Sequence, residues 1–272
     1  MTMMHYAIDG VDWQEERPPE TPTFLSSRHG YLVASIGGDV VPYGAEHLVG
    51  KMGGLWFHPL RIGAGWQLRL NGVPCVAAVR CTVRAECIER TYDLPGRQIV
   101  VTERMDDVLA ALLVGVSVTN TTDGPVDDRW EICVDAAIEG CWFGGMTAGQ
   151  TVAIGNNERV SGVCASGGDI CAGAVVAARA EIQWHYADGL LCGRTQQQMG
   201  AQTTTALHWG IAVDHDQDPN GVTQQLLRRL HDVATGRAPQ PAALPTLLLS
   251  TDADLDAYWR VACQNLGALR AE

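Results

Sequence analysis

The sequence predicts a mainly β protein: a large antiparallel sandwich of two sheets, with one short helix and a second helix at the C-terminal end. Three observations lead to this prediction. Apolar and polar residues alternate with period two from about residue 31 to residue 214, turn-forming clusters separate the alternating runs, and helical periodicity appears only after residue 218. The span is long for a seven-strand sandwich, so we expect roughly twelve or more strands.

Three runs show the alternation most clearly, namely "VRCTVRAEC" (79–87), "LAALLVGVSVTN" (109–120) and "RWEICVDAAI" (129–138). Each places apolar side chains on one face and polar side chains on the other, which is typical of a half-buried antiparallel strand. Turns are expected at 93–96, 120–125, 155–157 and 167–169, where Gly, Asn, Asp and Pro gather. The sequon at Asn120 falls in one of these and is interpreted as a turn.

Helical spacing begins after the last alternating run. Val222, Leu226, Leu230 and Val233 lie on one helical face, and Gly236 can end the helix. The Pro-rich stretch "GRAPQPAALP" follows, and then a second apolar stripe formed by Leu255, Tyr258, Trp259, Ala262, Leu266 and Leu269. We therefore divide the chain into a β-sandwich domain (1–235), a linker (236–249) and the first helix of a further helical domain (250–272).

Composition excludes several classes of protein. The net charge is −12, from 19 basic and 31 acidic residues, which disfavours binding to nucleic acid or to anionic membranes. No signal peptide and no apolar run of membrane-spanning length is visible. The nine cysteines form no C-x-x-C pair, so we expect reduced, buried thiols in a cytoplasmic protein, with no cofactor and no metal. In "DHDQDPNG" the calcium-loop spacing lacks its final Glu, because Leu227 stands there, and a turn is the better interpretation.

The stretch "GKMGGLWFHPLRIGAGWQLRLNG" (50–72) contains the candidate binding residues. Aromatic rings stack on sugar rings, and Arg or His can bind vicinal hydroxyls, so Trp56, His58, Arg61 and Trp66 are predicted to contact carbohydrate from a glycine-rich loop. The alternative is that these aromatic side chains fill the core of the sandwich.

Carboxylates give a weaker signal. Glycoside hydrolysis needs a pair of them, and "VTERMDD" (101–107) contains Glu103, Asp106 and Asp107. Glu103 lies in a strand-like run, and the two aspartates are predicted to be solvated turn charges, because charged side chains usually remain exposed. No catalytic residue is therefore assigned.

Three segments, 26–59, 102–135 and 247–272, carry a resemblance to a known family. They are similar to the N-terminal β-supersandwich domain of bacterial glycoside hydrolases of the glycogen-debranching, glucosidase and trehalase-like type. In that family the sandwich precedes a catalytic six-hairpin α/α barrel, which holds the catalytic acid and base. The resemblance implies that residues 250–272 open such a barrel and that this chain alone is inactive.

The expected function is thus that of a non-catalytic domain of a glycoside hydrolase acting on an α-glucan or a small glucoside. It would support the barrel and lend a loop to the substrate site. The expected partners are carbohydrate, the barrel, and a second copy bound through the C-terminal helix. Two alternatives stay open: a stand-alone carbohydrate-binding or mutarotase-like sandwich, and a sandwich used only for protein association.

Overall fold

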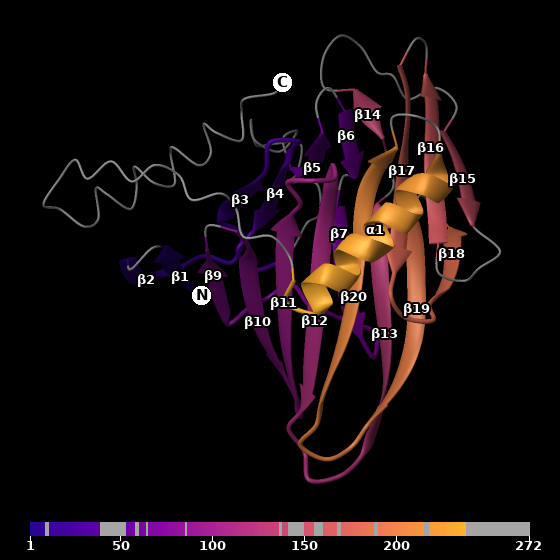
Figure 1. Ribbon diagram of the computed structural model, residues 1–272. Coiled ribbons are helices and arrows are strands. Elements are labelled where there is room, and N and C mark those ends of the chain that lie inside the picture. The colour runs from indigo at the N-terminus through magenta and orange to yellow at the C-terminus, as the bar shows by residue number, and fades with distance from the viewer. Residues whose placement is uncertain are drawn as a thin grey trace, which may run out of the picture.

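The computed structural model is an antiparallel β-sandwich with a helix on its outer face (Figure 1). It describes residues 1–8, 11–38, 53–57, 60–63, 65–84, 86–135, 138–140, 150–154, 160–167, 170–187, 190–214 and 218–237. A 10-stranded sheet forms one layer, and two 5-stranded sheets form the other. The mainly β fold class is therefore confirmed. No helix in the described ranges has the length and hydropathy to cross a membrane.

The large sheet contains, in spatial order, β15 (Gln150–Ile154), β16 (Val160–Gly167), β17 (Ile170–Ala178), β20 (Thr204–Asp214), β12 (Ala111–Asn120), β11 (Arg97–Met105), β10 (Ile88–Leu94), β9 (Arg80–Val83), β1 (Thr2–Ile8) and β2 (Val11–Arg17). Its described pairings are antiparallel except that β1 runs parallel to β9. One small sheet contains β18 (Gln183–Ala187), β19 (Leu190–Met199), β13 (Val126–Asp135), β7 (Gly65–Leu70) and β8 (Val73–Pro74). The other contains β14 (Glu139–Gly140), β6 (Leu60–Gly63), β5 (Gly54–Phe57), β4 (Tyr31–Ser35) and β3 (Pro22–Ser26).

The main core lies between the large sheet and both small sheets. The alternation predicted for 109–120 is confirmed, because Val114, Val116 and Val118 of β12 are buried there. Trp130 and Ile132 of β13 enter the same core from the opposite layer. Because successive side chains of a strand point to opposite faces, this register fixes which residues meet inside the sandwich.

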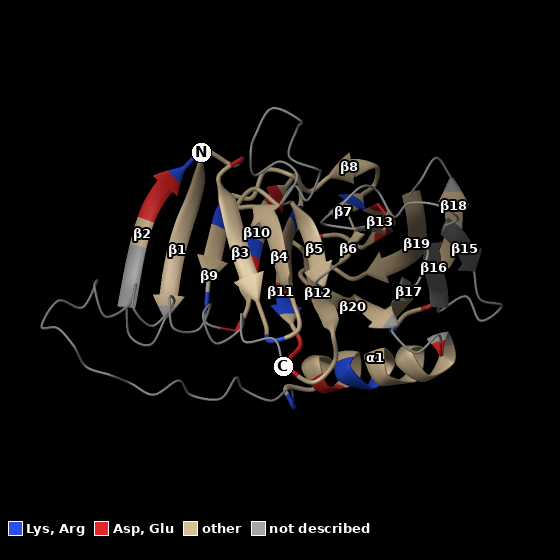
Figure 2. Cartoon of the chain, turned by 90° about the horizontal axis from the view of Figure 1, so that it is seen from above, with Lys and Arg blue, Asp and Glu red and all other residues tan. Residues whose placement is uncertain are grey.

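Helix α1 (Pro219–Ala234) packs on the outer face of the large sheet, across β12, β17 and β20 (Figures 1 and 2). Leu226 and Leu230 are fully buried in a second, smaller core against these strands. Gly210 permits the close approach, since a Cβ atom there would lie 3.0 Å from a methyl carbon of Leu226. The helix predicted from the spacing is confirmed, with Asp218 as its N-cap.

Two local predictions need correction. The run 79–87 is not one strand: β9 ends at Val83, and the amide of Arg84 donates to the carbonyl of Cys87 in a turn. The first thirty residues also form strands β1, β2 and β3, although no strand was predicted there. Strand β2 lies at the edge of the large sheet and has both acidic and basic residues (Figure 2). Glu16 and Arg17 are exposed and Glu15 is half-buried, so the strand lacks the apolar alternation of a buried strand.

The boundaries proposed at 236–249 and 250–272 fall almost entirely outside the described residues, as does the apolar stripe from Leu255 to Leu269. The turns predicted at 155–157 and 168–169 lie outside them too. The turn at 93–96 is confirmed as the β10–β11 connection, and the turn at 120–125 joins β12 to β13.

Candidate functional site

Residues 54–57 and 60–63 form the antiparallel strand pair β5–β6, rather than the glycine-rich loop that the sequence suggested. The register of the small sheet places Trp56 of β5 opposite Tyr31 of β4 on one side and opposite Arg61 of β6 on the other. The rings of Tyr31 and Trp56 stack with centroids 6.1 Å apart and planes 19° apart. The guanidinium carbon of Arg61 lies 5.8 Å from the centroid of the Trp56 ring. Two of the predicted contact residues, Trp56 and Arg61, are thus brought together.

Strand alternation separates Trp56 from its neighbours in sequence. Leu55 and Phe57 belong to the main core, whereas Trp56 points to the opposite face of the sheet and is not part of that core. The alternative interpretation, in which the aromatic residues fill the core, therefore holds for Phe57. Trp56 is nevertheless only 5% exposed and Arg61 only 8%. Tyr31 and Arg61 flank the indole from the adjoining strands, so its packing partners here are protein side chains.

The other two predicted contact residues are placed differently. His58 lies outside the described residues. Trp66, on β7, is buried in the main core, where its ring meets Trp209 of the large sheet edge-on at a centroid distance of 5.0 Å. The structure does not bring Trp66 together with Trp56 and Arg61, because β7 belongs to the other small sheet.

Two acidic residues of the run 101–107 are buried and paired: Glu103, which was expected in a strand-like run, and Asp106, which was predicted to be a solvated turn charge. Glu103 is fully buried, where it accepts a hydrogen bond from Nη1 of Arg90, while Nε of Arg90 donates to the carbonyl of Ser35 at 3.1 Å. Asp106 is 2% exposed and pairs with Arg229 of α1 at 2.6 Å. The prediction for Asp106 was wrong because it was based on the usual exposure of acids. A sequence signal existed for Glu103, since it shares the apolar phase of β11 with Val101.

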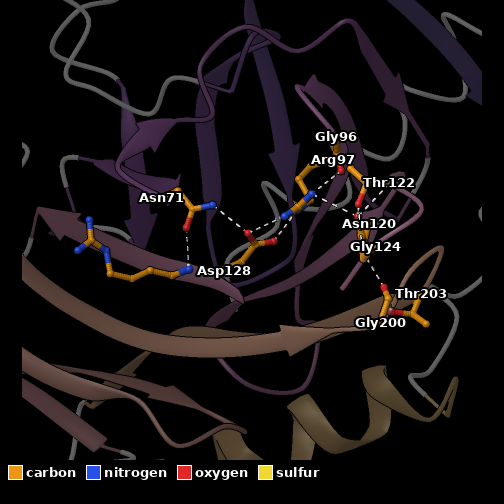
Figure 3. Close-up of polar contacts among 10 residues, drawn as sticks. Asn71, Gly96, Arg97, Asn120, Thr122, Gly124, Asp128, Gly200 and Thr203 are labelled. Carbon is orange, nitrogen blue, oxygen red and sulfur yellow. Dashed lines mark hydrogen bonds and ion pairs between the residues drawn. The ribbon is translucent and has the colours of Figure 1, made fainter. Parts of the chain in front are cut away.

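A satisfied polar network lies where β11, β13 and the β7–β8 turn meet (Figure 3). Arg97 donates to Asp128 from Nε at 2.6 Å and from Nη2 at 2.9 Å, and Asn71 donates to the same carboxylate at 2.9 Å. Burial by itself would raise the pKa of Asp128, but the hydrogen bonds from Arg97 and Asn71 outweigh it and hold the pKa below its usual value. The network therefore ties the large sheet to a small sheet through a charged carboxylate.

The same region explains the sequon at Asn120. Its side chain is fully buried, and Nδ2 donates to the carbonyls of Gly124 and Gly200, both at 2.8 Å (Figure 3). Both hydrogen bonds use the side-chain amide nitrogen, which is the atom that would carry a glycan. This confirms the interpretation of residues 120–125 as a turn.

The part of the chain that the structure describes contains no metal-binding cluster. No group of three or more His, Cys, Asp or Glu side chains there is arranged to hold a metal ion. Cys133 and Cys192 face each other on adjacent strands with their Sγ atoms 3.0 Å apart, and both are free thiols.

The fold defines the chain as a large antiparallel β-sandwich. No protein-family model matches the sequence, and no curated protein matches it. Among solved structures it is similar to a human-microbiome protein assigned as a kojibiose phosphorylase, with a TM-score of 0.50 and 9% identity over 89% of this chain. The chain spans 35% of the length of that protein. At this identity the likeness shows the fold alone.

Two further solved structures are similar over less of the chain. A protein of Escherichia coli K12 assigned as an aldose 1-epimerase has a TM-score of 0.42 and 10% identity over 72% of this chain and 99% of its own. A protein of Synechocystis sp. PCC 6803 has a TM-score of 0.46 and 8% identity over 74% of this chain and 97% of its own.

Proposed function

We propose that this chain is a carbohydrate-related β-sandwich domain that serves within a glycoside-processing enzyme and is itself non-catalytic. One observation carries the proposal: 89% of the chain matches the fold of about a third of a protein assigned as a kojibiose phosphorylase. A domain of that relative size leaves most of such an enzyme to be supplied by other segments. The resemblance of three segments to the supersandwich domain of barrel-type glycoside hydrolases supports the same role.

The proposed task of the domain is to support a catalytic barrel and to present carbohydrate-contacting side chains beside it. Trp56, His58 and Arg61 are our proposed contacts, with a helical barrel and a second copy of the chain as further proposed partners. Trp66 is a weaker candidate because its ring is enclosed by the core. Three buried acidic residues support a non-catalytic role, since Glu103, Asp106 and Asp128 are each engaged by an arginine.

The test is an activity screen of the purified 272-residue protein. We expect no hydrolysis and no phosphorolysis of kojibiose, maltooligosaccharides, trehalose or aryl glucosides above the buffer rate. Polarimetry of freshly dissolved α-D-glucose addresses the mutarotase-like alternative, and we expect no acceleration of its mutarotation. Turnover that disappears when a single carboxylate is replaced would contradict the proposal, and so would catalysed mutarotation.

A further inference from the structure

The small sheet that contains β18, β19 and β13 has an open corner. Strand β18 pairs with β19 only from Leu190 to Arg194, whereas β19 continues to Met199 and pairs over its whole length with β13. Among the described strands, none covers the β18 side of residues 195–199. The corner is polar, because the sequence there reads Thr-Gln-Gln-Gln.

A groove of about 430 Å³ lies at this corner. The register places Arg129, Gln196, Arg194 and Gln183 on the outer face, opposite to the face that carries Trp130 and Ile132 into the core. Gln197, which pairs with Asp128, has the phase of Trp130 and lines the groove from the open edge of β19. The side chains that the argument uses are Arg129, Glu181, Gln183, Arg194, Gln196 and Gln197. Ligand pockets commonly measure about 300–1,000 Å³. This groove therefore has room for a small ligand of one or two rings.

The charges of the groove are nearly balanced. Arg194 is already compensated, because its Nε donates to Oε1 of Glu131 at 2.5 Å. Arg129 and Glu181 bring one positive and one negative charge, and no ion pair is formed by either side chain with a described residue. An anion drawn to Arg129 would also meet the carboxylate of Glu181, and the charge of Arg194 is already compensated by Glu131. The groove thus favours a neutral ligand.

The amide side chains are held in place by hydrogen bonds that leave acceptors available. Nε2 of Gln196 donates to Asp127 at 2.6 Å, and Nε2 of Gln197 donates to Thr195 at 3.3 Å. Gln196, on the same face as Arg129, keeps its carbonyl oxygen as an acceptor, while the guanidinium of Arg129 can only donate. A mixture of donors and acceptors on a neutral surface matches hydroxyl groups, which both donate and accept. An apolar ligand would displace the water that is hydrogen-bonded to these groups and would offer no hydrogen bonds in its place.

We propose that this groove is a binding site for a neutral, hydroxyl-rich ligand of the size of a mono- or disaccharide. The inference deepens the proposed function and rests on it, since it names a neutral saccharide as a ligand. It adds a second contact, on the sheet of β18, β19 and β13, to the one proposed at Trp56 on the other small sheet. Arg194, Gln196 and Gln197 are fixed by hydrogen bonds within the protein. Arg129, Glu181 and Gln183 are the proposed hydrogen-bonding partners of the ligand.

Calorimetric or NMR titration of the full 272-residue protein tests the site, with kojibiose, maltose and trehalose as probes and inorganic phosphate as the anionic probe. We expect saturable binding of at least one disaccharide and none of phosphate. Arg129→Ala and Glu181→Ala should each weaken that binding by about fivefold, the effect of losing roughly one hydrogen bond. Both side chains are exposed, so the unfolding midpoint should not move. Arg80→Ala, an exposed arginine on the large sheet, is the matched control and should bind like the wild type.

Three results would overturn the inference: no binding of any of the disaccharides, tighter binding of phosphate than of any disaccharide, or unchanged affinity in both groove variants. These outcomes leave the proposed function testable, because that proposal is judged by the activity screen. Loss of disaccharide binding in Trp56→Phe together with normal binding in Arg129→Ala would transfer the contact to the β5–β6 strand pair and reject the groove.

Discussion

The carboxylate of Asp106 accepts a hydrogen bond from Nε of Arg229 at 2.6 Å, although the two residues are 123 positions apart in the sequence. Oδ1 of Asp106 also accepts from the amides of Val108 and Leu109, at 2.6 and 3.0 Å. One buried side chain thus shapes the β11–β12 connection and anchors α1 to the large sheet.

Arg229→Met should therefore destabilise the protein by about 3 kcal/mol, because it leaves the buried Asp106 without its charge partner. Urea unfolding followed by circular dichroism measures the change. Arg228→Met is the matched control on the same helix, since that side chain is exposed and should change the free energy of unfolding by less than about 0.5 kcal/mol. Equal effects of the two substitutions would show that the pair with Asp106 contributes nothing specific.

Asp128 should make stability depend on pH in the acid range. Its pKa is lowered in the folded state, so its contribution is complete above the ordinary pKa near 3.8 and is lost as the pH falls through the lower, folded value. Urea midpoints measured from neutral pH down to about pH 2 should fall for the wild type. Asp128→Asn should be less stable at neutral pH and should lose less stability over the same range. Parallel curves for the two proteins would contradict this assignment.

The buried cysteines Cys75, Cys81 and Cys133 should be unreactive in the native protein. Burial raises the pKa of Cys75 to about 12 and that of Cys81 to about 11. Burial, together with the neighbouring Cys192, raises the pKa of Cys133 to about 12. Since the thiolate is the reactive species, labelling by iodoacetamide at pH 8 should be slow at these positions and fast after denaturation. Peptide mass spectrometry reads each site, and rapid native labelling of Cys75 or Cys81 would refute the burial argument.

Replacement of Trp56 separates packing from carbohydrate contact. Because the ring is buried between Tyr31 and Arg61, Trp56→Ala should cost roughly 3–5 kcal/mol in stability. Trp56→Phe keeps an aromatic ring beside Tyr31 and should cost less, so the binding test belongs to this variant. A lower saccharide affinity of a fully folded Trp56→Phe protein would support the proposed contact. Normal affinity would make Trp56 a packing residue only.

Part of the candidate site was predictable and part was not. Trp56 and Arg61 were selected from composition alone, and the structure places them side by side because β5 and β6 pair with these residues opposite each other. Trp66 was selected by the same signal, but its strand joins a different sheet. The local sequence shows which side chains could contact a sugar. It does not show which sheet a strand joins, because that depends on pairing with strands far away in the sequence. The groove beside Arg129 was missed for this reason, because its side chains come from β13, β18 and β19 and from Glu181, which precedes β18.

The sequence by itself determined the strands and their buried faces wherever the period of two was clean, as in β12 and β13, because the pleat of a strand makes that period a direct consequence of one-sided burial. It also determined helix α1, through the spacing of its apolar residues, whereas the structure showed that Asp218 is the N-cap. Only the tertiary structure decided the order of the strands, with β20 between β17 and β12, and the partners of the buried charges. Asp106 and Arg229, 123 positions apart, form a long-range pair: the carboxylate can be buried only where the fold brings an opposite charge to it. Arg90 and Glu103 lie on the paired strands β10 and β11, 13 positions apart, and the tertiary structure decided that this pair is buried.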